Sequence, residues 1–194
     1  FDAAAATRTL HRRVDIGIAV DTEDGLFVPA LRNADVLDAA GVRAAVNRIR
    51  DQVRDRTIPA EELKGYTISL SNFGVYAGRY ATPVVVPPCV AIVAAGKLRH
   101  ELVPVMGGVE THRLLPLSLT FDHRAATGGE AARFLRALLD DLFYAIAHAV
   151  KARLTYDEKS HRDLLDELNE RLVDKYFVNF SVFESMPDVW AIDQ

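Results

Sequence analysis

The chain has 194 residues, of which 49% are hydrophobic and 26% charged, the composition of a folded globular protein rather than a disordered tail. Its formal net charge of -4 lacks the basic excess that binding to a phosphate backbone requires, so we expect no nucleic-acid partner. No apolar run approaches the roughly 18–20 residues of a membrane span and no signal-peptide pattern opens the chain, so we expect a cytoplasmic protein with no membrane partner. A single cysteine, Cys89, and the absence of zinc-type spacing predict neither a disulfide nor a metal site.

The charges divide unevenly along the chain. Residues 1–141 contain 17 basic and 17 acidic residues, whereas residues 142–194 contain 6 and 10. The whole net charge therefore belongs to the second segment, in which aromatic residues are also concentrated. A shift of this kind indicates two segments of different origin, with a boundary near Asp141.

The first half of the chain predicts a β-hairpin followed by a helix. Apolar and small or polar residues alternate over residues 14–20, a turn signal follows at Asp24-Gly25, and residues 26–31 form the return strand. Apolar residues then recur with helical spacing from Val42 to Val53, which predicts an amphipathic helix that lies on the sheet and ends before Pro59.

Short strands and a long helix are predicted in the rest of the first segment. Glycines and prolines separate four candidate strands, at residues 66–71, 83–86, 89–95 and 113–121, and helical periodicity begins after Thr127. Because no regular βαβ repeat is present, we expect an α/β fold with a two-layer mixed β-sheet, flanking helices and a helical C-terminal tail.

Histidine at a predicted strand end is the first candidate for catalysis. His123 falls where the strand of residues 113–121 gives way to the long helix, and an imidazole ordinarily titrates near neutral pH, as a general base requires. An isolated histidine in such a place is more often a structural turn residue. Thr127 and Glu130 form the pattern of a helix capping box, which explains both of them without catalysis.

Hydroxyl, amide and glycine residues end another predicted strand. Ser71, Asn72, Gly74 and Gly78 follow one another there; a hydroxyl at a strand end can donate to an oxyanion, and glycines allow close approach of a substrate. Any strand-to-loop exit uses the same residue types, so the pattern alone does not decide between these interpretations.

Three motifs occur in the order and spacing of a known family: VDIGIAVDTEDGLFVPALRNAD at 14–35, ELKGYTISLSNFGVYAGRYATPVVVPPCVAIVAAGKL at 62–98 and LPLSLTFDHRAATGGEAARFLRALLDDL at 115–142. Residues 1–141 resemble the catalytic domain of the dihydrolipoamide acyltransferases of 2-oxo acid dehydrogenase complexes, such as pyruvate dehydrogenase. The resemblance implies the fold of chloramphenicol acetyltransferase, homotrimers or a larger core with active sites between subunits, and lipoyl domains and the other complex subunits as partners.

The same resemblance implies the roles of individual residues. His123 matches the histidine of the His-Arg-x-x-Asp-Gly motif, which takes the thiol proton when an acyl group moves between dihydrolipoamide and coenzyme A. Ser71 matches the residue that hydrogen-bonds the tetrahedral oxyanion, and Asn72, Gly74 and Gly78 would shape the substrate pocket. Coenzyme A and the lipoyl group enter as substrates, with no metal.

Two departures from the family are visible. Thr127 stands where the motif has an aspartate, so the third candidate catalytic position keeps a helix cap but loses a negative charge. The lipoyl domain with its lipoate attachment site, the subunit-binding domain and the first part of the catalytic domain are expected to be absent from this chain. A trimer-forming remnant without turnover is therefore the rival interpretation.

The last segment departs from the acyltransferase family altogether. Its ending, DELNERLVDKYFVNFSVFESMPDVWAIDQ, resembles an internal stretch of the biosynthetic arginine decarboxylases, which use pyridoxal phosphate, although their cofactor lysine motif is absent. Residues 142–194 are interpreted as a decarboxylase-like fragment joined near Asp141 by natural fusion, rearrangement or an assembly artefact. A helix with a leucine stripe and an exposed aromatic patch is expected in this segment.

Overall fold

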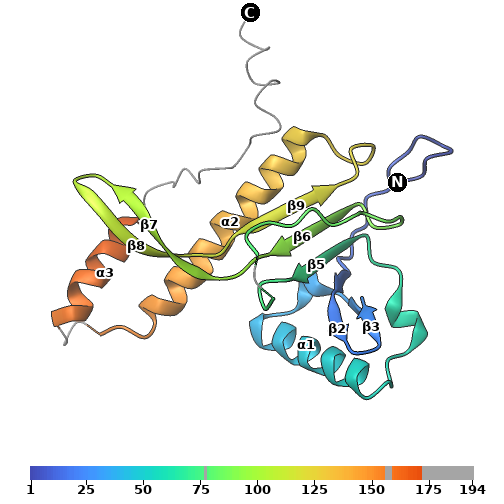
Figure 1. The fold of residues 1–194 in the computed structure, drawn as a ribbon, viewed down its shortest axis with the longest axis horizontal. Coiled ribbons are helices and arrows are strands. Elements are labelled where there is room, and N and C mark those ends of the chain that lie inside the picture. Colours follow the sequence, from blue (N-terminus) through green and yellow to red (C-terminus); the bar gives the residue numbers. More distant parts are fainter. Residues whose placement is uncertain (77, 156–158, 172–194) are drawn as a thin grey trace, which may run out of the picture. The chain divides into compact units, whose positions relative to one another are not determined.

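A computed structural model describes residues 1–76, 78–155 and 159–171 of the chain (Figure 1). The chain divides into two compact units, Phe1–Ala126 and a second that begins at Thr127. The first unit contains the strands and helix α1 (Ala39–Arg54), and the second contains helices α2 (Gly128–Lys151) and α3 (Lys159–Arg171). Among the described residues no helix is long and apolar enough to cross a bilayer.

Five strands form one mixed sheet in the order β4-β1-β5-β6-β9. They are β1 (Ile16–Ile18), β4 (Ala30–Leu31), β5 (Ile68–Asn72), β6 (Ala91–Ala95) and β9 (Leu117–Phe121). β1, β5 and β6 run parallel to one another, whereas the edge strands β4 and β9 are antiparallel to their neighbours. The mixed sheet with flanking helices that the sequence predicts is thus present.

The hairpin predicted for residues 14–31 is confirmed, but each of its legs is divided between two sheets. β2 (Val20–Thr22) and β3 (Gly25–Phe27) pair as a separate two-stranded sheet around the turn, while β1 and β4 pair within the main sheet. Pro29 separates β3 from β4 and accepts a hydrogen bond from the Ile18 N–H. Because proline has no N–H, it cannot continue the ladder as a donor.

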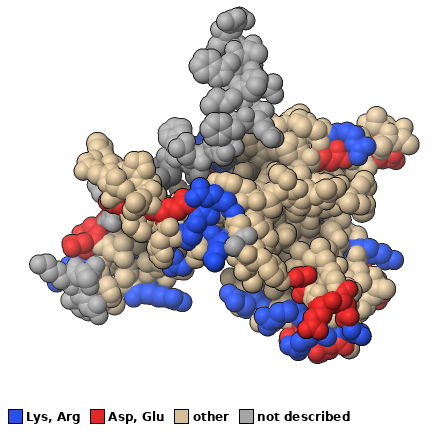
Figure 2. Space-filling view, in the orientation of Figure 1, with Lys and Arg blue, Asp and Glu red and all other residues tan. Residues whose placement is uncertain are grey.

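Helix α1 forms where the apolar periodicity predicts it. The Asp38 carboxylate accepts a hydrogen bond from the Gly41 N–H at 2.7 Å, which caps the first turn. Ile49 and Val53 are buried, and the helix contacts β2 and β4. Acidic and basic side chains are interspersed over the region of α1, β2 and β3 (Figure 2), in keeping with the balanced charge of residues 1–141.

Two of the predicted strands are wrong in part or in whole. Residues 83–86 form no strand; Val84 and Val86 are 81% and 65% exposed, and the surrounding prolines remove donors from any ladder. The strand predicted at 113–121 is two strands, because Pro116 lies between the end of β8 (Gly108–Leu114) and β9.

One β-hairpin was not predicted from the sequence, apart from residues 113–114 at the end of its second strand. β7 (Arg99–Val105) pairs with β8 along its whole length, around the glycines at 107 and 108. Charged and imidazole side chains and Pro104 interrupt the apolar alternation in β7, and none of the residues of β7 or β8 is buried. A strand without a buried face lacks the alternating pattern from which strands are predicted.

The second unit begins with the predicted capping box. Thr127 Oγ1 accepts from the Glu130 N–H at 3.2 Å, and the Glu130 carboxylate accepts from the Thr127 N–H at 2.8 Å. The apolar stripe that follows is only partly covered: Ala131 is buried, whereas Phe134 and Ile146 are 43% and 56% exposed.

Helix α3 contains the first leucines of the stripe predicted for the tail. Leu165 is buried and Leu164 is partly exposed. The predicted end of the stripe at Leu172 and the aromatic patch lie outside the described residues.

A buried carboxylate ties three segments of the first unit together. Asp15, directly before β1, accepts from Arg32 Nη1 and from the Asn33 N–H, both at 2.9 Å. Arg32 Nη2 also donates to the carbonyls of Glu61 and Lys64, before β5. Burial alone would raise the pKa of Asp15, but the hydrogen bonds from Asn33 and Arg32 outweigh it and hold that pKa below its ordinary value.

We predict that Arg32→Ala lowers the free energy of unfolding by about 2–3 kcal/mol at neutral pH, because it removes the less exposed charged partner of the buried Asp15 carboxylate and the hydrogen bonds to the carbonyls of Glu61 and Lys64. Arg13→Ala, which removes the more exposed partner of Asp15 (63% exposed against 30% for Arg32), should cost less than about 1 kcal/mol. Because folding lowers the pKa of Asp15, its ionised carboxylate stabilises the folded state at pH values above its ordinary pKa of 3.8. This stabilisation is lost as the pH falls through the folded-state pKa. Urea unfolding of both variants at neutral and acid pH tests this; equal losses at neutral pH would contradict it.

We predict that Thr127→Ala lowers the free energy of unfolding by about 0.5–2 kcal/mol, because the first turn of α2 loses its cap. Thr127→Asp keeps a capping oxygen and adds a negative charge at a helix N-terminus, so it should match or slightly exceed wild type. Thermal unfolding of the three proteins gives the comparison. An aspartate variant less stable than the alanine variant would refute a capping role for this position.

Candidate functional site

The candidate base lies just beyond the edge strand of the sheet. His123 follows the end of β9 by two residues, in an exposed turn, and its ring lies 5.0 Å from the ring of Phe121, measured between centroids. Within the described part of the chain no hydrogen bond holds the imidazole. A histidine that lies just beyond a strand and makes no internal hydrogen bond can take a proton from a bound molecule.

The residues directly before and after His123, Asp122 and Arg124, form an ion pair. The Asp122 carboxylate accepts from Arg124 Nε at 2.9 Å, Arg124 Nη2 at 2.7 Å and the Arg124 N–H at 3.0 Å. These hydrogen bonds lower the pKa of Asp122 to about 2, so Asp122 is ionised and engaged with Arg124 at neutral pH. The ion pair of Asp122 with Arg124 was not predicted from the sequence, although an acidic and a basic residue on either side of the candidate histidine were its signal.

The N-terminal arm lies against the same turn. Arg8 donates to the carbonyl of Ala125 at 3.3 Å, and the Arg124 guanidinium lies 5.5 Å from the centre of the Phe1 ring. The Asp122 N–H donates to the carbonyl of Val90, the residue directly before β6. The turn that contains His123 therefore contacts side chains of the N-terminal arm and the backbone carbonyl of Val90.

The candidate oxyanion donor lies at the other end of the sheet. Ser71, near the C-terminal end of β5, is paired with Ala94, which is paired in turn with Ser118 near the start of β9. By strand geometry the Cα atoms of Ser71 and Phe121 are roughly 14 Å apart, and His123 lies two residues further on. The structure therefore does not bring Ser71 and His123 of one chain together.

The neighbours of Ser71 have structural roles in the turn after β5. Asn72 Oδ1 accepts from the Gly74 N–H at 3.2 Å. A Cβ on Gly74 would lie 2.5 Å from the carbonyl oxygen of Gly96, and one on Gly78, whose φ is +153°, would lie 2.7 Å from the Phe73 ring. These residues allow close backbone packing; their predicted part in substrate binding stays a prediction.

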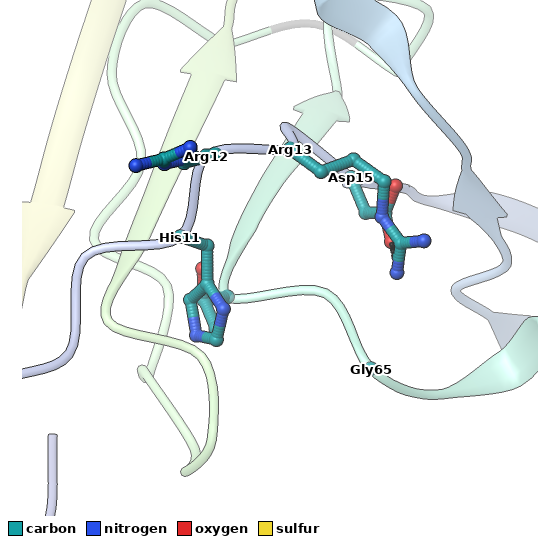
Figure 3. Close-up of a pocket in the computed structure, with 6 residues that line it drawn as sticks. His11, Arg12, Arg13, Asp15 and Gly65 are labelled. Carbon is teal, nitrogen blue, oxygen red and sulfur yellow. Dashed lines mark ion pairs between the residues drawn. The ribbon is translucent and has the colours of Figure 1, made fainter.

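A cavity opens at the His123 end of the sheet. It has a volume of about 330 Å³ and lies at the N-terminal ends of β1 and β5 (Figure 3). The residues that line it are His11, Arg12, Arg13, Asp15, Gly65 and Thr67. In the view of Figure 3 the side chains of Arg12 and Arg13 extend in opposite directions, Arg13 toward Asp15. Among the described residues no cluster of three side chains could hold a metal ion.

Two protein families match the sequence. The model of the 2-oxoacid dehydrogenases acyltransferase (catalytic domain) family matches residues 1–143, and that of the arginine decarboxylase helical bundle domain matches residues 135–169. The two matches overlap within helix α2.

Individual relatives likewise match either the acyltransferase part of the chain or the decarboxylase-like part. The chain is 35% identical over 134 residues to the dihydrolipoyllysine-residue acetyltransferase component of the pyruvate dehydrogenase complex of Mycoplasma pneumoniae, covering 69% of this chain and 33% of that protein. It is 36% identical over 138 residues to the lipoamide acyltransferase component of the branched-chain alpha-keto acid dehydrogenase complex of Pseudomonas aeruginosa, covering 71% and 32%. It is also 85% identical over 59 residues to the biosynthetic arginine decarboxylase of Xanthomonas campestris, covering 30% and 9%.

Solved structures agree with the sequence matches. The dihydrolipoamide acetyltransferase of Azotobacter vinelandii is 35% identical, with a TM-score of 0.63 over 66% of this chain and 53% of that one. The cubic core of a pyruvate dehydrogenase multienzyme complex gives 35% identity and a TM-score of 0.62 over 65% and 52%. The chain thus spans about a third of the acyltransferase relatives and about half of the solved chains. With a family match over residues 1–143 and a shared fold, the chain belongs to the acyltransferase catalytic-domain family of the 2-oxoacid dehydrogenases.

Proposed function

We propose that this protein transfers an acyl group between a dihydrolipoyl group and coenzyme A, with His123 as the general base and Ser71 as the oxyanion donor. The observation that carries the proposal is the exposed imidazole of His123, which is fixed at the end of β9 and has no hydrogen-bond partner in the described part of the chain. A general base needs this combination of rigid placement and an open nitrogen.

Residue spacing supports the assignment. The Azotobacter vinelandii structure was determined to examine the catalytic roles of a serine, a histidine 52 residues after it and an asparagine four residues after the histidine. Ser71 and His123 are likewise 52 residues apart, and Thr127 follows His123 by four. Asparagine, aspartate and threonine all cap helices, so Thr127 is compatible with the position even without a negative charge.

The chemistry needs only groups that the chain supplies. His123 takes the proton of the coenzyme A thiol, and the resulting thiolate attacks the carbonyl carbon of the acyl-dihydrolipoyl thioester. The Ser71 hydroxyl donates a hydrogen bond to the tetrahedral oxyanion. Collapse of this intermediate breaks the bond to the dihydrolipoyl sulfur, which recovers the proton from His123 and leaves acyl-coenzyme A.

The separation of Ser71 from His123 supports a site that is shared between copies of the chain. Because these residues lie at opposite ends of one sheet, a complete site forms where the His123 end of one copy meets the Ser71 end of another. Closed rings of identical subunits produce such head-to-tail contacts. We therefore propose a homotrimer or a larger core assembly, which the resemblance to the cubic core of a pyruvate dehydrogenase complex supports.

The decarboxylase-like segment is proposed to begin near Asp141, inside helix α2. This position falls within residues 135–143, where both family matches overlap. We do not assign decarboxylase activity to the chain, since the match to the Xanthomonas campestris enzyme covers only 9% of that protein.

We predict that His123→Ala lowers the rate of acyl transfer from acetyl-dihydrolipoamide to coenzyme A by about 10²- to 10⁴-fold, the usual loss for a general base. In the same assay Ser71→Ala should lower turnover by about 10²- to 10³-fold and leave the affinity for coenzyme A nearly unchanged, because its hydrogen bond forms in the transition state. Near-full turnover of the histidine variant would exclude its role as base. No turnover by the wild-type chain would favour the non-catalytic, trimer-forming interpretation.

A further inference from the structure

The cavity at the N-terminal ends of β1 and β5 contains a cation that no acid in the described residues neutralises. Arg13 is paired with Asp15 at 3.1 Å, and Asp15 is also paired with Arg32. Arg12, also in the lining, has no ion pair or hydrogen bond among the described residues. The lining therefore presents one unpaired guanidinium together with the imidazole of His11 and the hydroxyl of Thr67.

We propose that this cavity binds a phosphate group of coenzyme A, with Arg12 as its main ligand and His11 and Thr67 beside it. The proposal rests on the proposed acyl-transfer function and adds the place where the carrier of the thiol is held. A guanidinium binds phosphate through paired N–H donors, and a hydroxyl can donate to a further phosphate oxygen.

The position of the cavity relative to His123 favours this ligand over an unrelated anion. The Thr67 carbonyl accepts from the Val90 N–H, and the Val90 carbonyl accepts from the Asp122 N–H. These three residues therefore form one row across the sheet, and the cavity wall at Thr67 is roughly 10 Å from the residue that precedes His123. Coenzyme A carries its thiol and its phosphates at opposite ends of a flexible arm, so it can occupy both places at once.

The arm that contributes the basic residues is fixed at the same end. Arg8 of this arm donates to Ala125 in the histidine turn, and Phe1 lies under Arg124. Residues 11–13 are thus connected at one side to the turn and at the other to Asp15 and β1. A ligand group bound by Arg12 would be held at a defined distance from the proposed base.

The test is calorimetric titration of the full chain with coenzyme A and with pantetheine, the thiol arm without phosphates. Arg12→Gln should weaken coenzyme A binding about tenfold, the loss expected for one charge-assisted contact, and leave pantetheine binding unchanged. Arg43→Gln, on the exposed side of α1, removes the same charge elsewhere and should change neither affinity. Inorganic phosphate is titrated in parallel.

Each alternative outcome is distinct. Equal affinities of wild type and Arg12→Gln for coenzyme A would overturn the phosphate site. So would an equal loss of affinity for coenzyme A and for pantetheine in the variant. Either result would leave the acyl-transfer proposal standing. Tight binding of inorganic phosphate with no advantage of coenzyme A over pantetheine would assign the cavity to free phosphate and overturn the proposal. A wild-type chain that binds neither thiol contradicts this site and the proposed function together.

Discussion

The direction of one edge strand governs what this protein can do alone. β9 runs antiparallel to β6, which is parallel to β5, so the C-terminal end of β9 lies at the end of the sheet where β5 and β6 begin. His123 follows β9, whereas Ser71 is near the C-terminal end of β5. The two groups proposed to act on one thioester are thereby separated by the length of the sheet, which is why we propose that a second copy completes the site.

Polar clusters stabilise the His123 end, and close backbone packing shapes the Ser71 end. At the first, Asp15 joins β1 to the segment before β5, and Asp122 with Arg124 holds the turn after β9. At the second, Gly74 packs against the backbone of Gly96. Each end is therefore fixed by contacts within one chain, and rigid supports of this kind can position groups for catalysis.

Much of this architecture could be predicted from the sequence, and the failures have physical causes. Helix α1, strand β5 and the capping box of α2 follow from local patterns that tertiary contacts reinforce. Strand pairing partners are not encoded locally, so the separation of Ser71 from His123 was not predictable from spacing alone. The cavity at Arg12 brings together residues 11–15 and 65–67, which no short motif could reveal. Helix α2 runs unbroken through the overlap of two family matches, so a change in composition near Asp141 does not coincide with a loop.

Mixed assemblies test the two-copy site most directly. His123→Ala and Ser71→Ala chains with different tags are produced together, and assemblies that contain both are purified and assayed for acyl transfer to coenzyme A. A trimer that contains both variants has an intact histidine opposite an intact serine at one contact in three. About a third of wild-type activity should therefore return for a trimer, and about a quarter for a large, randomly mixed core, in preparations whose parent variants are nearly inactive. Activity no greater than the mean of the two variants purified separately would contradict a site shared between copies.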